Sequence, residues 1–164
     1  ASLHPEYERK WLLARLPEVP FLRCLRIRQG YIEQNGAWVR IRETIFPDGS
    51  VQCILCRKLH IPDGNMEWEA PISQDAFEML WTLCDGNSLS KTRCEFLDDA
   101  GFRWEIDVYA GALEGLLVME LELPAPNADF HIPDVLAACI EREVTGDPGW
   151  SNRALARRTR TASW

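Results

Sequence analysis

The sequence predicts an α+β fold: an eight-stranded antiparallel β-barrel that forms a tunnel with a charged interior, with helices packed outside it. Apolar and charged residues alternate with a period of two in eight segments, and in a strand this alternation places the charged side chains on one face. Two other segments have apolar residues at helical spacing, and their apolar faces need the apolar side of the sheet as a partner. Twisted strands that curl beneath such helices enclose their charged face.

The eight strands are separated by short turn signals. Sequences such as QNG at 34–36, PDGS at 47–50 and DDAG at 98–101 are typical of turns between neighbouring strands. Short connections of this kind join antiparallel strands. The predicted strands are 4–10, 25–32, 37–44, 50–58, 65–72, 91–97, 102–109 and 117–123.

Two helices are predicted between and after these strands. The segment 73–85 begins with Ser73 as a cap and repeats apolar residues at helical spacing, and the segment 133–144 shows the same pattern after Pro133. The 164 residues, 46% of them hydrophobic, suffice for one domain with its own core. We therefore expect a single domain over 1–164, in which 157–164 form a flexible tail.

Composition disfavours several classes of protein. The net charge of -7 disfavours a nucleic-acid or anionic-membrane binder, because such partners require a basic surface. We find no membrane-spanning window and no secretory leader, so a soluble, cytoplasmic protein is expected. The six cysteines are then expected to be reduced, buried thiols, and the C-x-x-C pair Cys53 and Cys56 lacks the second pair of a zinc site.

The charged face of the strands contains residues of both signs. Acidic members are Glu6, Glu8, Glu67, Glu69, Glu95, Glu105, Asp107, Glu120 and Glu122, and basic members are Lys10, Arg28, Arg40, Arg42, Arg57, Lys91 and Arg93. These charges could be the solvated side of an ordinary sheet, or a network of ion pairs that neutralise one another. A polyphosphate with a divalent metal also fits, because phosphate oxygens suit arginine and lysine whereas Mg²⁺ or Mn²⁺ is held by carboxylates.

The motifs on these strands resemble one known family. The stretch EYERKW at 6–11 resembles the E-x-E-x-K signature of the CYTH family, also called triphosphate tunnel metalloenzymes. Later motifs follow in the family's order over nearly the whole chain, namely IRQGYI, VRIR, SKTR, WEIDVYAG, MELEL and VTGDPGWSNRALA. Bacterial inorganic triphosphatases are the members it resembles most.

The resemblance implies an enzyme, a Mg²⁺- or Mn²⁺-dependent triphosphatase that hydrolyses tripolyphosphate to diphosphate and phosphate. It implies catalytic roles for Glu6, Glu8, Lys10 and Tyr31, with Tyr31 close to Lys10. The substrate-binding residues would be Lys10, Arg40, Arg42, Arg57, Lys91 and Arg93, and the metal-site carboxylates would be Glu6, Glu8, Glu105, Asp107, Glu120 and Glu122. Thiamine triphosphatase or adenylate cyclase activity in the same family, and a non-catalytic polyphosphate-binding module, are the alternatives.

The sequence departs from the family's pattern at two places. The family places a lysine at the end of the strand CILCRK, and the best register puts Arg57 at that position, with Lys58 beside it. Asn65 or Met66 stands where the family has an arginine.

For residues 151–158 a fraying helix is expected, and a lid over one tunnel mouth is the weaker hypothesis. The expected partner is a small triphosphate, without nucleic acid or membrane. Apolar outer strand faces and seven tryptophans are compatible with a homodimer.

Overall fold

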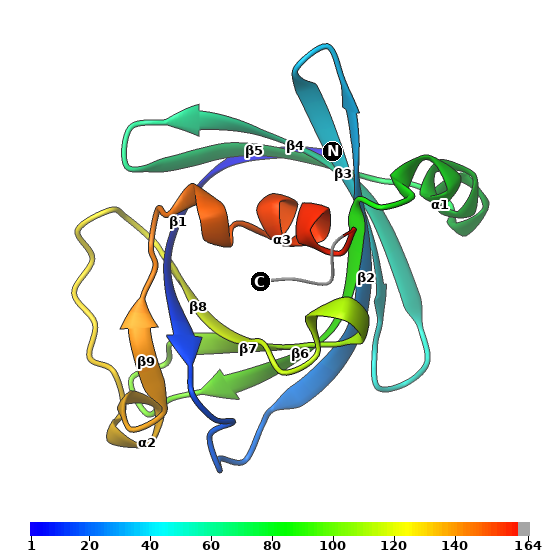
Figure 1. Ribbon diagram of the computed structural model, residues 1–164. Helices are drawn as coiled ribbons and strands as arrows, with labels where there is room; N and C mark the ends of the chain where they lie inside the picture. Colours follow the sequence, from blue (N-terminus) through cyan, green and yellow to red (C-terminus); the bar gives the residue numbers. More distant parts are fainter. Residues whose placement is uncertain (161–164) are drawn as a thin grey trace.

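Eight antiparallel strands form a closed barrel in the computed structural model, which describes residues 1–160 (Figure 1). The strands follow one another around the barrel in the order β5-β4-β3-β2-β6-β7-β8-β1, and pairing of β1 with β5 closes the ring. Their bounds are β1 Ser2–Leu13, β2 Arg23–Gln34, β3 Ala37–Ile45, β4 Val51–Ile61, β5 Gly64–Pro71, β6 Ser88–Leu97, β7 Arg103–Tyr109 and β8 Leu117–Leu123. The predicted fold class and all eight predicted strands are confirmed.

Strand β1 closes the barrel by using different halves for different neighbours. Residues 2–6 pair with β5, whereas residues 7–12 pair with β8. Close approach at this seam requires a glycine, because a Cβ on Gly64 would lie 2.3 Å from the backbone oxygen of Glu6. The strand with the E-x-E-x-K motif is therefore also the one that completes the ring.

The predicted helix over 133–144 is wrong for most of its length. Only α2, Asp134–Ala137, is helical, and Ile140–Glu143 form a ninth strand, β9. This strand pairs with β1 at Trp11, Leu12 and Leu13, on the stretch of β1 that β5 leaves uncovered. The hydrogen bonds offered by this edge override the helical spacing of the apolar residues.

The first predicted helix is confirmed and packs outside the barrel (Figure 1). Helix α1, Gln74–Trp81, begins at Ser73, whose side-chain oxygen accepts a hydrogen bond of 3.0 Å from the backbone N–H of Ala76, and it continues into η1, Thr82–Cys84. Its Phe77 is fully buried in a core cluster with Ile41 of β3 and Cys53 of β4. This apolar packing holds α1 on the outer face of β3 and β4.

The C-terminal helix covers one end of the barrel (Figure 1), which agrees with the weaker of the two hypotheses drawn from the sequence for residues 151–158. Helix α3, Asn152–Arg158, lies across the barrel opening in Figure 1, preceded by η3, Pro148–Trp150. Its Leu155 and Ala156 are fully buried against Leu12 and Tyr31, which point into the barrel. The first two residues of the expected tail of 157–164 belong to α3. Residues 161–164 of that tail lie outside the described residues.

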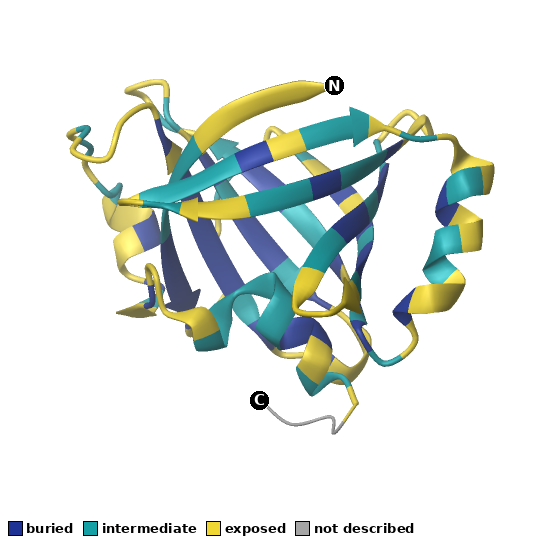
Figure 2. Ribbon diagram, turned by 90° about the horizontal axis from the view of Figure 1, so that it is seen from above, coloured by how far each residue is buried: buried dark blue, intermediate teal, exposed yellow. Residues whose placement is uncertain are grey.

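Burial increases along β1 from its exposed first residues to its buried last ones. In Figure 2 the start of β1 is exposed, whereas the strands behind it are largely buried. A second short helix, η2 at Gly111–Leu113, buries Leu113 in the cluster that also holds Leu155 of α3.

Within residues 1–160, no helix combines the length and apolar character needed to cross a membrane.

The prediction of six reduced cysteines is wrong for two of them. Cys24 of β2 and Cys94 of β6 lie directly opposite each other, with Cα atoms 4.1 Å apart, and form a disulfide. The strand register brings them together from 70 positions apart in the chain, which no spacing in the sequence reveals. Cys53, Cys56, Cys84 and Cys139 are buried free thiols, as predicted.

Candidate active site

A cavity of about 560 Å³ lies inside the barrel and is lined mostly by charged side chains. Because successive residues of a strand point to opposite faces, alternate residues of each strand reach it. The lining residues are His4, Glu6, Glu8, Lys10, Tyr31, Trp38, Arg40, Arg42, Lys58, His60, Asn65, Glu67, Arg93, Glu105, Glu120, Glu122, Pro148, Ser151, Asn152 and Arg153. The charged face predicted from the sequence is thus the wall of an internal cavity.

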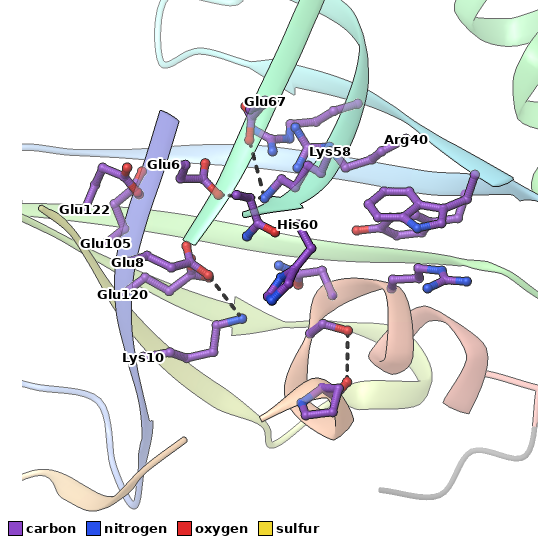
Figure 3. Close-up of a pocket in the computed structure, with 18 of the residues that line it drawn as sticks. Glu6, Glu8, Lys10, Arg40, Lys58, His60, Glu67, Glu105, Glu120 and Glu122 are labelled. Atoms are coloured by element: carbon purple, nitrogen blue, oxygen red, sulfur yellow. Dashed lines mark hydrogen bonds and ion pairs between the residues drawn. The ribbon is translucent and has the colours of Figure 1, made fainter. Parts of the chain in front are cut away.

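Carboxylates gather on one side of this cavity (Figure 3). The strand register places Glu8 of β1 opposite Glu122 of β8, and Lys10 opposite Glu120. Glu6, Glu8 and Glu122 each offer one oxygen atom, and these three atoms lie within 4.8 Å of one another. Three carboxylate oxygens at this spacing suit a hard divalent cation such as Mg²⁺ or Mn²⁺.

The crowding of these carboxylates changes their pKa values. Burial, followed by repulsion from Glu120, raises the pKa of Glu8. Although Glu122 is in contact with solvent, desolvation within the barrel and then repulsion from Glu6 raise its pKa to about 8. Like charges held this close disfavour ionisation, and a bound cation would relieve the repulsion.

Two arginines occupy the opposite wall. Arg40 and Arg42 point inward from β3, which lies four strands from β8 in either direction around the ring. The Nε atom of Arg42 and the Nε and Nη2 atoms of Arg40 are buried without a hydrogen-bond partner among the described residues. Burial, followed by repulsion from Arg40 and Arg93, lowers the pKa of Arg42 to about 10. These guanidinium groups have donors to offer to an anion in the cavity.

Other cations lie between the two walls and are paired with carboxylates. Lys58 Nζ lies 2.8 Å from Glu6 Oε1 and 3.4 Å from Glu67 Oε2. Lys10 Nζ lies 3.6 Å from Glu8 Oε1 and donates a hydrogen bond of 3.3 Å to the backbone oxygen of Trp150. The lining is therefore partly neutralised from within. Arg40 of β3 also has a carboxylate near it, with Nη2 3.8 Å from Glu69 Oε1, but the Nε atoms of Arg40 and Arg42 keep no hydrogen-bond partner among the described residues.

Asp107 anchors two of the predicted phosphate-binding cations and does not line the cavity. Its carboxylate accepts hydrogen bonds of 2.8 Å from both Lys91 Nζ and Arg93 Nε. Burial alone would raise the pKa of Asp107, but Arg93 and Lys91 together lower it. Lys91 is also absent from the lining, whereas Arg93 reaches the cavity and approaches Glu105 at 3.2 Å. Asp107 thus orients Arg93.

Two residues predicted for the interior point outward. Arg57 is half-buried on the outer face of β4, and Lys58 takes the inward position because Lys58, not Arg57, pairs with inward-facing Glu67. Arg28 lies on the outer face of β2, where it donates to Glu43 at 2.7 Å and also bonds Glu78 of α1. Lys58 therefore supplies the interior lysine, and Arg57 does not replace it.

Tyr31, Glu105 and Glu120 line the cavity, whereas Glu95 does not. Tyr31 lines the cavity, but the hydrogen bond of its hydroxyl comes from the Gln29 side chain at 2.9 Å, and none joins it to Lys10 within residues 1–160. Glu105 and Glu120 line the cavity as expected. Glu95 is buried away from it and accepts a hydrogen bond of 2.6 Å from Arg23.

Sequence reasoning missed several lining residues. Trp38 precedes the β3 arginines at the same two-residue spacing, a signal that could have identified it. Asn152 and Arg153 reach the cavity from α3, and no strand periodicity applies to them. His4, which lies two positions before Glu6, forms with Glu67 and Glu69 a second group whose ligand atoms lie within 4.8 Å of one another.

A closed antiparallel barrel in which a carboxylate cluster faces guanidinium groups with unused hydrogen-bond donors defines a tunnel protein with an interior suited to a polyanion. The chain is 35% identical over 153 residues to an inorganic triphosphatase of Acetivibrio thermocellus, covering 93% of each chain. It is 32% identical to an inorganic triphosphatase of Nitrosomonas europaea, covering 92% of this chain and 96% of the relative. The crystal structure of the inorganic triphosphatase NE1496 matches with 28% identity and a TM-score of 0.65, over 92% of this chain and 97% of that one.

No protein-family model matches the chain. The identity and coverage of the curated relatives nevertheless show that the chain belongs to the family of these inorganic triphosphatases. The resemblance to triphosphate tunnel metalloenzymes drawn from the sequence motifs is thereby confirmed.

Proposed function

We propose that this protein is a Mg²⁺- or Mn²⁺-dependent triphosphatase that hydrolyses inorganic tripolyphosphate to diphosphate and phosphate. The observation that carries the proposal is the opposition of two walls, with the Glu6, Glu8 and Glu122 oxygens on one side and, on the other, buried Arg40 and Arg42 donors that lack a hydrogen-bond partner among the described residues. Arg40 has one long ion pair, 3.8 Å from Nη2 to Glu69 Oε1, whereas Arg42 has none within residues 1–160, so the ion pairs of the cavity do not neutralise every buried cation. The names of the curated relatives support the same activity.

The cation would be held by Glu6, Glu8 and Glu122, since their oxygens converge and suit a hard ion. When bound, it would supply Lewis acidity that neutralises phosphate oxygens and lowers the pKa of water. The protein's own contribution is placement, because Glu6 and Glu8 follow each other on the inward face of β1 and the β1–β8 register sets Glu122 opposite Glu8. The ion pair between Lys58 and Glu6 helps to orient one of them.

The phosphate chain would lie between the walls, where Arg40, Arg42 and Arg93 can donate to its oxygens. Arg93 is held by Asp107, so its orientation is fixed before substrate arrives. Burial would lower the pKa of Lys10, but Glu120 and Glu8 raise it, and Lys10 remains a cation beside the reacting phosphate. Positioning and electrostatic stabilisation of this kind account for most catalysis of phosphoryl transfer, and no covalent nucleophile is required.

Phosphate release from tripolyphosphate tests the proposal directly. We expect the purified protein to release orthophosphate from tripolyphosphate with Mg²⁺ or Mn²⁺, and to lose this activity when EDTA removes the metal. Release can be followed with a colorimetric phosphate assay, with circular dichroism to confirm that the protein is folded. A folded protein that releases no phosphate with either metal would contradict the proposal and favour a binding module.

Metal binding is expected to strengthen as the pH rises from 7 to 9. With a pKa of about 8, Glu122 is mostly neutral at pH 7 and mostly ionised at pH 9, and a carboxylate must be ionised to bind metal. The affinity of the substrate-free protein for Mg²⁺, measured by calorimetry, should rise by roughly tenfold over this range.

The same shift has the opposite effect on the stability of the metal-free protein. The folded state retains the proton of Glu122 between the ordinary pKa of 4.5 and about 8, so the free energy of unfolding falls as the pH rises through this window. Glu122→Gln should weaken the pH dependence of the Mg²⁺ affinity and that of the free energy of unfolding. An Mg²⁺ affinity that is equal at pH 7 and 9 would rule out this role for Glu122.

A further inference from the structure

Helix α3 extends the basic wall of β3 with one more arginine. The inward side chains of β3 follow one another as Trp38, Arg40 and Arg42. The guanidinium group of Arg153 lies over the Trp38 ring, 5.1 Å from its centroid, and Arg153 lines the cavity. The row of guanidinium groups therefore continues past Trp38 to the end of the cavity that α3 covers.

The backbone of α3 is firmly placed at this position. The Asn152 side-chain oxygen accepts a hydrogen bond of 2.5 Å from the Tyr109 hydroxyl and one of 3.4 Å from Lys91 Nζ. One turn later, Leu155 is fully buried inside the end of the barrel. Arg153 thus projects from a fixed helix, and its reach into the cavity does not depend on a loop.

Glu33 is the present partner of Arg153, and it is doubly paired. Arg153 Nε donates to Glu33 Oε1 at 2.7 Å, and Arg157 Nη2 donates to both oxygens of Glu33 at 2.6 and 2.8 Å. Hydrogen bonds from Arg157, followed by those from Arg153, lower the pKa of Glu33. Because Arg157 alone can neutralise Glu33, Arg153 can share its donors with a ligand without leaving a carboxylate unpaired.

We propose that Arg153 is a further substrate-binding residue, which contacts the terminal phosphate at the end of the chain remote from Glu6, Glu8 and Glu122. This inference rests on the proposed function and deepens it. An unesterified terminal phosphate carries roughly two negative charges at neutral pH. When ATP binds with its γ-phosphate at the carboxylate cluster, the phosphate at the Arg153 end is the esterified α-phosphate, which carries one negative charge and an organic group. A guanidinium fork at this end therefore favours inorganic tripolyphosphate over ATP.

The test compares Arg153→Gln with the matched control Arg157→Gln. Both variants remove one arginine from Glu33, but Arg153 lines the cavity, whereas Arg157 is an exposed residue absent from the lining. With metal present, we expect Arg153→Gln to raise KM for tripolyphosphate about tenfold or more with little change in kcat. KM for ATP should change less, and Arg157→Gln should leave KM for tripolyphosphate within about twofold.

Several results would overturn this assignment. If both variants raise KM for tripolyphosphate equally, the arginines act by holding α3 through Glu33. If neither variant raises this KM, Arg153 does not contact the terminal phosphate. If Arg153→Gln raises KM for ATP as much as KM for tripolyphosphate, Arg153 does not select the terminal phosphate. Melting temperatures of the two variants serve as the control for folding.

Failure of the proposed function itself is distinguishable from failure of this inference. If the wild-type protein releases no phosphate, binding of tripolyphosphate can be measured by calorimetry on the same three proteins. Weaker binding by Arg153→Gln alone would support the contact with Arg153, and equal binding by all three would overturn it.

Discussion

The double substitution Glu6→Gln, Glu8→Gln is expected to reduce phosphate release from tripolyphosphate by a factor of about 100 or more. Glutamine keeps the size of the side chain but removes the charge of two of the three carboxylates whose oxygens converge. A divalent cation then loses most of its ligand charge, so the loss should appear in kcat and should not be restored by saturating substrate. Phosphate release at increasing Mg²⁺ or Mn²⁺ concentrations measures the effect.

The control for this variant is Glu141→Gln, which changes an exposed carboxylate on β9. It should retain the activity of the wild-type protein. The double variant should also melt no lower than the wild type when metal is absent, because burial, followed by repulsion from neighbouring carboxylates, disfavours the charged form of both residues and raises their pKa values. Retention of full metal-dependent activity by the folded double variant would exclude these residues as metal ligands.

Substitution of Arg42 by methionine is expected to stabilise the protein while weakening its binding of tripolyphosphate. The Arg42 guanidinium is desolvated and repelled by Arg40 and Arg93, and it forms no ion pair within residues 1–160. Replacing such a charge with an apolar side chain of similar length removes an unfavourable interaction, often worth about 1–4 kcal/mol. The melting temperature of the ligand-free protein should rise by roughly 2–4 °C for each kcal/mol gained.

The same substitution should raise KM for tripolyphosphate about tenfold or more, since a charge-assisted hydrogen bond to phosphate is lost. Thermal melting without ligand and initial rates with metal measure the two effects on one sample. Arg26→Met, at an exposed arginine of β2, is the matched control and should change neither quantity appreciably. A lower melting temperature with unchanged KM would show that Arg42 is a structural residue.

The strands of this barrel were predictable where one face is charged and the other apolar. Glu6, Glu8 and Lys10 alternate with residues that pack outside, so the inward face of β1 follows from the sequence alone. Strand β4 lacks this contrast, since Ile54 and Cys56 face inward while Cys53 and Leu55 face outward toward α1. With both faces apolar, the pattern could not decide which of the next two residues, Arg57 or Lys58, enters the cavity.

Other features depend on contacts between distant segments. Residues 140–143 have helical spacing but pair with β1, because its edge is open there. The contribution of Arg153 to the cavity depends on where α3 docks, which is determined by burial of Leu155 at the end of the barrel. Neither the open edge nor the docking position can be inferred from local periodicity, since both exist only after the ring has closed.

The way β1 closes the barrel links ligand binding to the stability of that closure. Only residues 2–6 of β1 pair with β5, and Glu6 lies within this stretch while Glu8 follows it. A ligand that bridges these carboxylates and the arginines of β3 would link strands on the two sides of the β1–β5 pairing across the interior of the barrel. The stability of the β1–β5 pairing then depends on the concentrations of free substrate and metal.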